Sequence, residues 1–339
     1  MIEIDGSCGE GGGQILRTSL SLAAVTGTPV HFTKIRANRK KKGLMRQHRI
    51  CALAVSEITG GSLSGAELSS QEMTFLPGKI RGGEYHFRTG SAGSAILIAQ
   101  TVIPVLLYGE KPSRVVLEGG THVPGAPIYE FFQRVYLACL RRMGAEIDSS
   151  LLRTGFYPVG GGKVVLEIRP VREWRSLELT DGGEKIGGRV VAAGSGLDPK
   201  ILEDEVEITR EKLGMGCDWK TETLSADSPG PGNVLFLELV RRNITELFSV
   251  CGEVELSRKV VAERVAAMAK RYLASDVAAG RFLADQLLLP MALGKGGAFT
   301  TLPPSLHTKT NEEIIRKFLD AKIEMNNRKD GTFLIEVKK

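Results

Sequence analysis

The sequence has no apolar run long enough to cross a membrane. No uninterrupted apolar stretch approaches the ~18 residues of a membrane-spanning helix, and the first ten residues, MIEIDGSCGE, have neither the basic nor the apolar region of a secretion signal. We therefore expect a cytoplasmic protein with no membrane role. The chain has 339 residues, 42% of them hydrophobic. This length exceeds the roughly 250–300 residues at which one core stops growing, so we expect two domains.

Cysteine is scarce, and its spacing excludes the usual cysteine-based sites. The five cysteines are odd in number, far apart and never form a C-x-x-C pair. This spacing argues against both a disulfide framework and a structural zinc site. We expect reduced and mostly buried thiols at Cys8, Cys51, Cys139, Cys217 and Cys251.

Both common glycine-rich nucleotide-binding patterns are missing. Residues 5–20 read DGSCGEGGGQILRTSL, with five glycines around Glu10. No Gly-Lys-Ser/Thr ending follows there or at 294–297, which excludes the Walker loop. The dinucleotide pattern G-x-G-x-x-G fails because Gln14 stands at its third glycine position. The glycines therefore predict a close approach to the backbone without identifying a ligand.

One supersecondary pattern occurs three times, starting near residues 11, 91 and 280. Each copy predicts an apolar-rich helix, a short strand, a loop, a second helix and an extended closing segment. We expect closing hairpins at 72–88 and 155–170, and a last strand at 332–339. Three such α+β units predict a pseudo-threefold domain.

Residues 181–277 do not fit the repeat and are predicted to form an inserted domain. Their pattern alternates strands and helices of its own. Ser257 and the pair Asp198–Pro199 are expected to start its two helices, because the first amides of a helix lack internal partners. The overall prediction is an α+β fold with a repeat domain over 1–180 and 278–339 and a smaller α/β insert over 181–277.

The connection before the second helix of each unit falls at residues 37–43, 121–127 and 305–310. Loops at equivalent ends can converge on one site, and of the five histidines His307 is the one in such a loop immediately before a helix start. We expect a helix to follow it, with a capping box between Thr310 and Glu313. That helix end would attract anions. Packing or capping is the alternative role for His307.

The first helix of each unit carries one polar residue among apolar neighbours, namely Arg17, Gln100 and Gln286. Three polar residues at equivalent places suggest a shared polar cavity, and satisfied hydrogen bonds between helices explain them equally well. Asp285 and Glu10 are the carboxylates most suited to face such a cavity, with ordinary solvated charge as the alternative.

Residues 34–49 lack acidic side chains. They contain eight lysines and arginines and no aspartate or glutamate. A solvated face is the usual fate of such a run, but the absence of acids favours a phosphate-rich ligand. The neighbouring apolar stretch CALAV is typical of core and not of a membrane-inserting face.

Six segments together make the chain resemble the RNA 3'-terminal phosphate cyclase family. In order they are DGSCGEGGGQILR, IRANRKKKGLMRQH, GSAGSAILIAQT, GFYPVGGG, RFLADQLLLPMAL and SLHTKTN. The resemblance covers the whole length. It implies three repeats similar to the C-terminal domain of translation initiation factor 3 and an insert with a thioredoxin-like arrangement.

The resemblance also implies a mechanism. His307 would attack the α-phosphate of ATP to give a covalent histidine–AMP, and the AMP would pass to an RNA 3'-phosphate. The neighbouring 2'-hydroxyl would then displace AMP and leave a 2',3'-cyclic end. Neutral imidazole suits this nucleophilic role near pH 7.

Further residues take roles from the same resemblance. Phe282 stands where family members have tyrosine, so stacking on adenine is kept while a phenol hydrogen bond is lost. A divalent cation, Mg or Mn, is expected to accompany ATP at Glu10. The bidentate arginine fork suits a terminal phosphate. The implied ATP-binding residues are Gln100, Pro127, Phe282, Asp285 and Gln286, and the implied RNA-phosphate-binding residues are Arg17, Arg36 and Arg39.

Two other functions compete with the cyclase. A catalytically inactive cyclase-like protein that assists ribosome assembly would lack the histidine, and the intact HTKTN at 307–311 favours the enzyme. A carboxyvinyl transferase uses similar repeats but needs neither the insert nor a histidine nucleophile.

Overall fold

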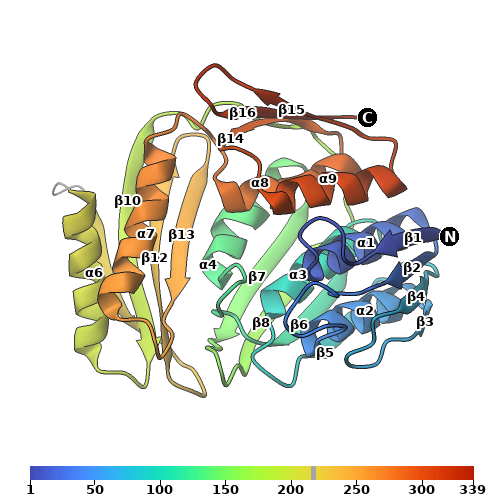
Figure 1. Ribbon diagram of the computed structural model, residues 1–339, viewed down its shortest axis with the longest axis horizontal. Coiled ribbons are helices and arrows are strands. Elements are labelled where there is room, and N and C mark those ends of the chain that lie inside the picture. Colours follow the sequence, from blue (N-terminus) through green and yellow to red (C-terminus); the bar gives the residue numbers. More distant parts are fainter. Residues whose placement is uncertain (215–218) are drawn as a thin grey trace.

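The computed structural model describes residues 1–214 and 219–339, and the strands of these residues form four four-stranded sheets (Figure 1). Three of the sheets share one topology. In each, the first and second strands in chain order are parallel, and the fourth strand lies antiparallel between the second and the third. This shared order agrees with the predicted α+β class and with several repeated βα units.

The first sheet has the order β1-β2-β4-β3 and carries two helices. Its elements are β1 (Ile2–Asp5), α1 (Gly13–Thr26), β2 (Val30–Thr33), α2 (Arg46–Thr59), β3 (Ser62–Ser64) and β4 (Met73–Leu76). The helices α1 and α2 end at Gly27 and Gly60, whose left-handed backbone is readily adopted by glycine.

The second sheet has the order β5-β6-β8-β7. Its second helix is continuous in the chain but contains one π-helical stretch. The elements are β5 (Glu84–Arg88), α3 (Ala95–Leu106), β6 (Ser113–Gly119), α4 (Tyr129–Phe131), the π-helical η1 (Phe132–Tyr136), α5 (Leu137–Arg142), β7 (Glu146–Arg153) and β8 (Gly162–Arg169).

The third sheet has the order β15-β16-β14-β9. Its elements are β9 (Leu177–Leu179), α8 (Arg281–Leu293), β14 (Gly297–Thr301), α9 (Leu306–Phe318), β15 (Lys322–Asn327) and β16 (Phe333–Lys338). The first strand is therefore separated from the rest of its unit by the whole of the fourth sheet. Figure 1 shows this third unit in orange and red along one side of the molecule.

The hairpin predicted at 72–88 is wrong. Its two arms, β4 and β5, lie in different sheets, and β5 pairs in parallel with β6. The residues between them include Pro77, Gly78, Gly82 and Gly83, which suit a connection between sheets as well as a tight turn. Strand β5 therefore opens the second unit, and the first unit closes with β3 and β4. The last strand predicted at 332–339 is confirmed as β16.

Two other boundaries also differ from the prediction. A hairpin is present near 155–170, but its arms are β7 and β8. Its first arm therefore ends at Arg153, and the start of the expected segment forms the turn. The last helix begins at Leu306 and not after Thr310, because the Ser305 side chain accepts a hydrogen bond from the Thr308 amide at 3.1 Å. The Thr310 hydroxyl is not a cap, since it accepts a hydrogen bond from the Glu10 amide.

The fourth sheet, in the order β11-β10-β12-β13, lies between β9 and α8 in the chain. Its elements are β10 (Lys185–Ser195), α6 (Pro199–Leu213), β11 (Lys220–Ser225), β12 (Gly232–Arg241), β13 (Thr245–Cys251) and α7 (Arg258–Leu273). The caps predicted for its helices are confirmed, with Asp198 before Pro199 in α6 and Ser257 before α7. The domain boundaries at 180 and 278 stay a prediction.

Both faces of this fourth sheet are buried, in two different cores. Val190 and Leu235 face a cluster that includes the apolar sides of α6 and α7. Their neighbours Val191 and Phe236 face the large core shared by the three repeated units. Because side chains alternate along a strand, this one sheet joins the two clusters.

Two expectations from composition can be compared with the structure. The four described cysteines are free, with Cys8 exposed and the other three buried, while Cys217 lies outside the described residues. Among the described helices, none combines the length and the apolar character needed to cross a membrane.

Candidate active site

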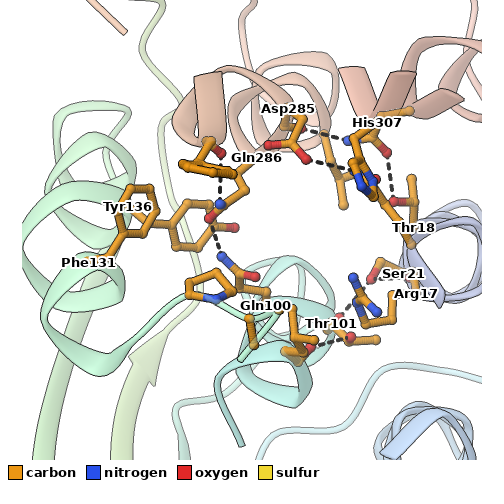
Figure 2. A pocket seen from close by; sticks show the side chains of 18 of the residues that line it. Arg17, Thr18, Ser21, Gln100, Thr101, Phe131, Tyr136, Asp285, Gln286 and His307 are labelled. Atoms are coloured by element: carbon orange, nitrogen blue, oxygen red, sulfur yellow. Dashed lines mark hydrogen bonds between the residues drawn. The ribbon is translucent and has the colours of Figure 1, made fainter. Parts of the chain in front are cut away.

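A cavity of about 400 Å³ opens where the helices of the units meet (Figure 2). Its walls come from α1, α3, α8 and α9, from the loop 125–127, from η1 and from β13. Seven of the ten predicted site residues line it, namely Arg17, Gln100, Pro127, Phe282, Asp285, Gln286 and His307. The polar residues predicted at equivalent places of the three units, Arg17, Gln100 and Gln286, therefore share one cavity.

His307 lies in the first turn of α9, and its side chain is 50% exposed. Its Nδ1 is 2.6 Å from the Gln14 Oε1. An amide oxygen can only accept, so the proton of the neutral ring is on Nδ1 and Nε2 keeps its lone pair. Burial lowers the pKa of His307, and the nearby Arg17 and Arg39 lower it further, against the opposing effect of Glu10. The ring is thus a neutral base with a free Nε2 at pH 7.

Gln14 links His307 to a buried carboxylate. The Gln14 Nε2 donates to the Asp285 Oδ2 at 3.3 Å. Because an ionised carboxylate only accepts, Asp285 assigns the orientation of the Gln14 amide and so the tautomer of His307. Burial raises the pKa of Asp285 to about 7, while the hydrogen bond from Gln14 opposes the rise. Protonation of Asp285 near neutral pH therefore weakens its hold on the orientation of the Gln14 side-chain amide, and so on the tautomer of His307.

Gln14 was not among the predicted site residues. In the sequence it only excluded the dinucleotide pattern. The signal was present in the spacing. Positions i, i+3, i+4 and i+7 of a helix share one face, and they are occupied here by Gln14, Arg17, Thr18 and Ser21. The structure places all four in the cavity wall.

Glu10 lies beside the cavity and not in its wall. Its Oε2 is 4.0 Å from the His307 Nδ1 and forms an ion pair with Arg39. Its Oε1 accepts a hydrogen bond from the backbone N–H of Gln14 at 3.3 Å. The Arg39 guanidinium also donates to the Glu10 carbonyl at 2.8 Å. A side chain at Gly12 would put its Cβ 2.3 Å from the Glu10 carboxylate. The backbone of the glycine loop is thus closely approached, as predicted, and the groups that approach it are the side chains of Glu10 and Arg39.

Positive charge exceeds negative charge around Glu10. Arg17 and Arg36 form no ion pair with any of the described residues, and burial lowers the pKa of both. The Arg36 Nε is buried with no hydrogen-bond partner among those residues. His48 stays neutral beside them, because burial and the two arginines lower its pKa to about 3. Such a cluster offers unsatisfied donors to an anion.

The other end of the cavity is largely apolar. Phe131, Tyr136, Leu247 and Leu289 line it, and Phe282 stands at its edge with half of its surface exposed. Figure 2 shows Phe131, Tyr136, Gln100 and Gln286 on one side, opposite His307 and Arg17. Leu247 and Ser249 come from β13 and were not predicted, because they lie in the segment expected to form a separate domain.

Two amides at this end hold each other in place. The Gln286 Nε2 donates to the Phe282 carbonyl at 2.8 Å, and the Gln100 Nε2 donates to the Gln286 Oε1. These bonds leave the Gln100 Oε1 as an acceptor. The end is suited to a flat ring that carries a hydrogen-bond donor on its edge.

The described residues do not form a metal cage. No group of three or more histidine, cysteine, aspartate or glutamate side chains gathers among residues 1–214 and 219–339 in a way that could hold an ion. Mg²⁺ commonly binds through one or two carboxylates, with phosphates and water completing its shell. Glu10 fits that smaller role as a hard oxygen ligand, provided that Arg39 turns away from it.

The fold places a cavity between helices, with an apolar end and a cationic end that lies beside the imidazole of His307. The RNA 3'-terminal phosphate cyclase family matches this chain over residues 8–325. A curated relative, "RNA 3'-terminal phosphate cyclase" of Koribacter versatilis (strain Ellin345), is 45% identical over 330 residues, or 97% of this chain and 93% of the relative. The chain belongs to the RNA 3'-terminal phosphate cyclase family.

One solved structure shows a weaker likeness. The crystal structure of the enolpyruvyl transferase NikO from Streptomyces tendae matches 99% of this chain, which spans about half of that chain (48%). The identity is 11% and the TM-score 0.35. A likeness at this level carries no argument about function.

Proposed function

We propose that this chain converts an RNA 3'-terminal phosphate to a 2',3'-cyclic phosphodiester at the expense of ATP, through a covalent histidine–AMP and an RNA adenylate. Family membership and the name of the Koribacter relative support the overall reaction. The observation that carries the histidine route is the neutral His307 ring, whose Nδ1 is held by Gln14 while Nε2 is free.

The apolar end of the cavity is the proposed adenine site. Phe282 offers an aromatic ring, and Pro127 and Leu289 add apolar side chains to the same cavity wall. The Gln100 Oε1 is an acceptor for the exocyclic amine of adenine. This placement directs the phosphates toward His307 and the arginines at the other end.

The first chemical step forms the bond between the His307 Nε2 and the α-phosphorus and breaks the bond from that phosphorus to pyrophosphate. The imidazole becomes cationic as it forms the bond. Gln14 stabilises this charge by accepting from Nδ1–H, and the Glu10 carboxylate 4.0 Å away adds attraction. Arg17 lies in the same wall, where it can balance negative charge on the phosphates.

The remaining steps need an anion site beside His307. Arg17, Arg36 and Arg39 supply it for the RNA 3'-phosphate, whose oxygen attacks the AMP phosphorus and releases neutral His307. The 2'-hydroxyl oxygen then attacks the terminal phosphorus, AMP leaves and the hydroxyl proton is released. This attack is intramolecular, and effective molarities of such arrangements reach ~10⁵ M or more.

Glu10 is the proposed ligand of a divalent cation, Mg or Mn, that arrives with ATP. When bound, such an ion would neutralise phosphate charge. Arg39 would then leave Glu10 and become available to the RNA phosphate. Breaking this one ion pair would therefore accompany both cation binding and RNA binding.

Incubation with α-labelled ATP tests the proposal. The wild-type protein should become labelled through an acid-labile, base-stable bond, and His307→Ala should lower the labelling by at least about a thousandfold. His86→Ala is the matched control, because His86 is paired with Glu118 in the second sheet and lies outside the cavity wall.

Labelling of His307→Ala at the wild-type level would overturn the assignment. A wild-type protein that binds RNA but takes no label would favour the inactive ribosome-assembly role. The cyclase step has its own check, since an end with a 2'-deoxyribose should accept AMP and stall.

A further inference from the structure

The fourth sheet makes contact with the proposed nucleotide site through β13. Leu247 and Ser249 of this strand line the cavity. Glu246, directly before them, is only 1% exposed. Its Oε1 accepts from the Gly280 amide at 2.6 Å, and its Oε2 accepts from the Leu247 amide at 3.3 Å. Gly280 is the residue that precedes the first turn of α8.

Helix α8 has no side-chain cap of its own. Gly280 stands at the N-cap position, where Ser, Thr, Asp or Asn would normally accept from the first amides. Glu246, from another sheet, accepts from the amide of Gly280 itself, as the glutamate of a capping box does at the N-cap residue. In its ionised form it also places negative charge at the positive end of the helix dipole. Among the described residues it forms no ion pair, so this helix end and the two amides are its stabilising partners.

The segment that leads into α8 is held at two further points, one from β12 and one from α7. The Arg241 Nη1 donates to the Val277 carbonyl at 3.0 Å, and the Tyr272 hydroxyl donates to the Ala278 carbonyl at 2.9 Å. Together with Glu246, these side chains fix the start of the helix that carries Phe282, Asp285 and Gln286.

We propose that Glu246 is a positioning residue for the nucleotide site, which sets the position of α8 and through it the adenine-binding side chains. The inference rests on the proposed function. It gives the fourth sheet a task in catalysis, namely to fix from outside the repeated units the helix that carries Phe282, Asp285 and Gln286 in the cavity wall. Glu246 touches no substrate in this proposal and acts only through α8.

Burial makes this arrangement costly and therefore sensitive to change. Burial raises the pKa of Glu246 to about 8, while the amides of Gly280 and Leu247 oppose the rise. The space is also tight, since a Cβ at Gly280 would lie 3.1 Å from three atoms of the Glu246 carboxyl group. Gly280→Ala therefore displaces the carboxyl group without removing it.

The experiment compares Glu246→Ala with Glu205→Ala. Glu205 is the matched control, because it is also 1% exposed in the same sheet-and-helix layer, but its two oxygens accept from Asn233 and not from α8. Glu246→Ala should raise the KM for ATP in self-labelling about tenfold and speed hydrogen exchange of the amides at 281–284. Glu205→Ala should leave both within about twofold, and Glu246→Gln, which keeps an acceptor, should restore most of the KM.

Equal shifts of KM in the two alanine variants would overturn the proposal, as would unchanged exchange at 281–284. If Glu246→Ala does not fold, Gly280→Ala decides, because an unchanged KM in that variant contradicts a positioning role. A wild-type protein that takes no label would instead overturn the proposed function, and the exchange comparison would still decide whether Glu246 holds α8.

Discussion

At one end of the cavity, His307, Gln14 and Asp285 form a line of hydrogen bonds in which each proton position depends on the next. At the other end, Gln100 and Gln286 bond each other between aromatic and aliphatic side chains. The first end contains titratable groups, whose protonation sets the hydrogen bonds of His307. The second end contains neutral groups, whose shape sets which ring can bind there. Substitutions at the two ends should therefore change different kinetic constants, although α8 contributes to both.

Gln14→Ala should give the largest separation of the two ends. Without the Gln14 acceptor, His307 loses the partner that fixes its tautomer, and the self-labelling rate should fall about thirtyfold while the KM for ATP stays within about threefold. Rapid-quench measurement over a range of ATP concentrations checks this. A raised KM with an unchanged maximal rate would place Gln14 at the nucleotide-binding end.

Phe282→Ala should have a smaller effect, and it should change the KM for ATP and not the maximal rate. Loss of this half-exposed ring, which we propose stacks on adenine, should raise the KM for ATP about tenfold with little change in the maximal rate. Phe282→Tyr is the control, because it keeps the ring and should remain close to the wild-type protein. Equal losses of maximal rate and affinity in the alanine variant would contradict the division of the cavity.

Asp285 allows the comparison to be sharpened by pH. Its pKa of about 7 means that it loses its proton as the pH rises through 7, and the charged form then holds the Gln14 amide. The self-labelling rate should rise a few-fold between pH 6 and pH 8. In Asp285→Asn the rise should disappear, because Asn keeps an acceptor at every pH. Burial lowers the pKa of His307, which shifts its own titration to lower pH than that of a free imidazole. Persistence of the rise in the variant would assign it to a group other than Asp285.

The sequence predicted the repeated helices and strands well where periodicity was strong, and failed where partners are distant. The arms of the 72–88 segment were both extended, but nothing local says that β5 pairs with β6 and not with β4. Ser305 was missed as a cap because Thr310 offered a second capping pattern, and only the structure shows that Thr310 binds the Glu10 amide.

The site residues divide in the same way. Those on the first helices, such as Arg17 and Gln100, were found because equivalent positions repeat. His307 gained its role from the family resemblance, and those roles stay predictions. Leu247 and Ser249, which line the cavity, and Glu246, which accepts from the Gly280 amide, had no signal, because they lie in the segment expected to form a separate domain. Contacts of that kind follow from the fold and cannot be predicted from local pattern.

The split third unit has a consequence for the order of folding. The first two sheets are each built from strands that follow one another in the chain, so they can form as synthesis proceeds. The third requires Leu177 to pair with Gly297, which closes a loop containing the whole fourth sheet. Loop entropy grows only slowly with length, so the equilibrium cost is modest, but pairings of such high contact order form late. His307 belongs to this last unit, so a partly folded chain would hold an assembled cationic loop before the proposed nucleophile is in place.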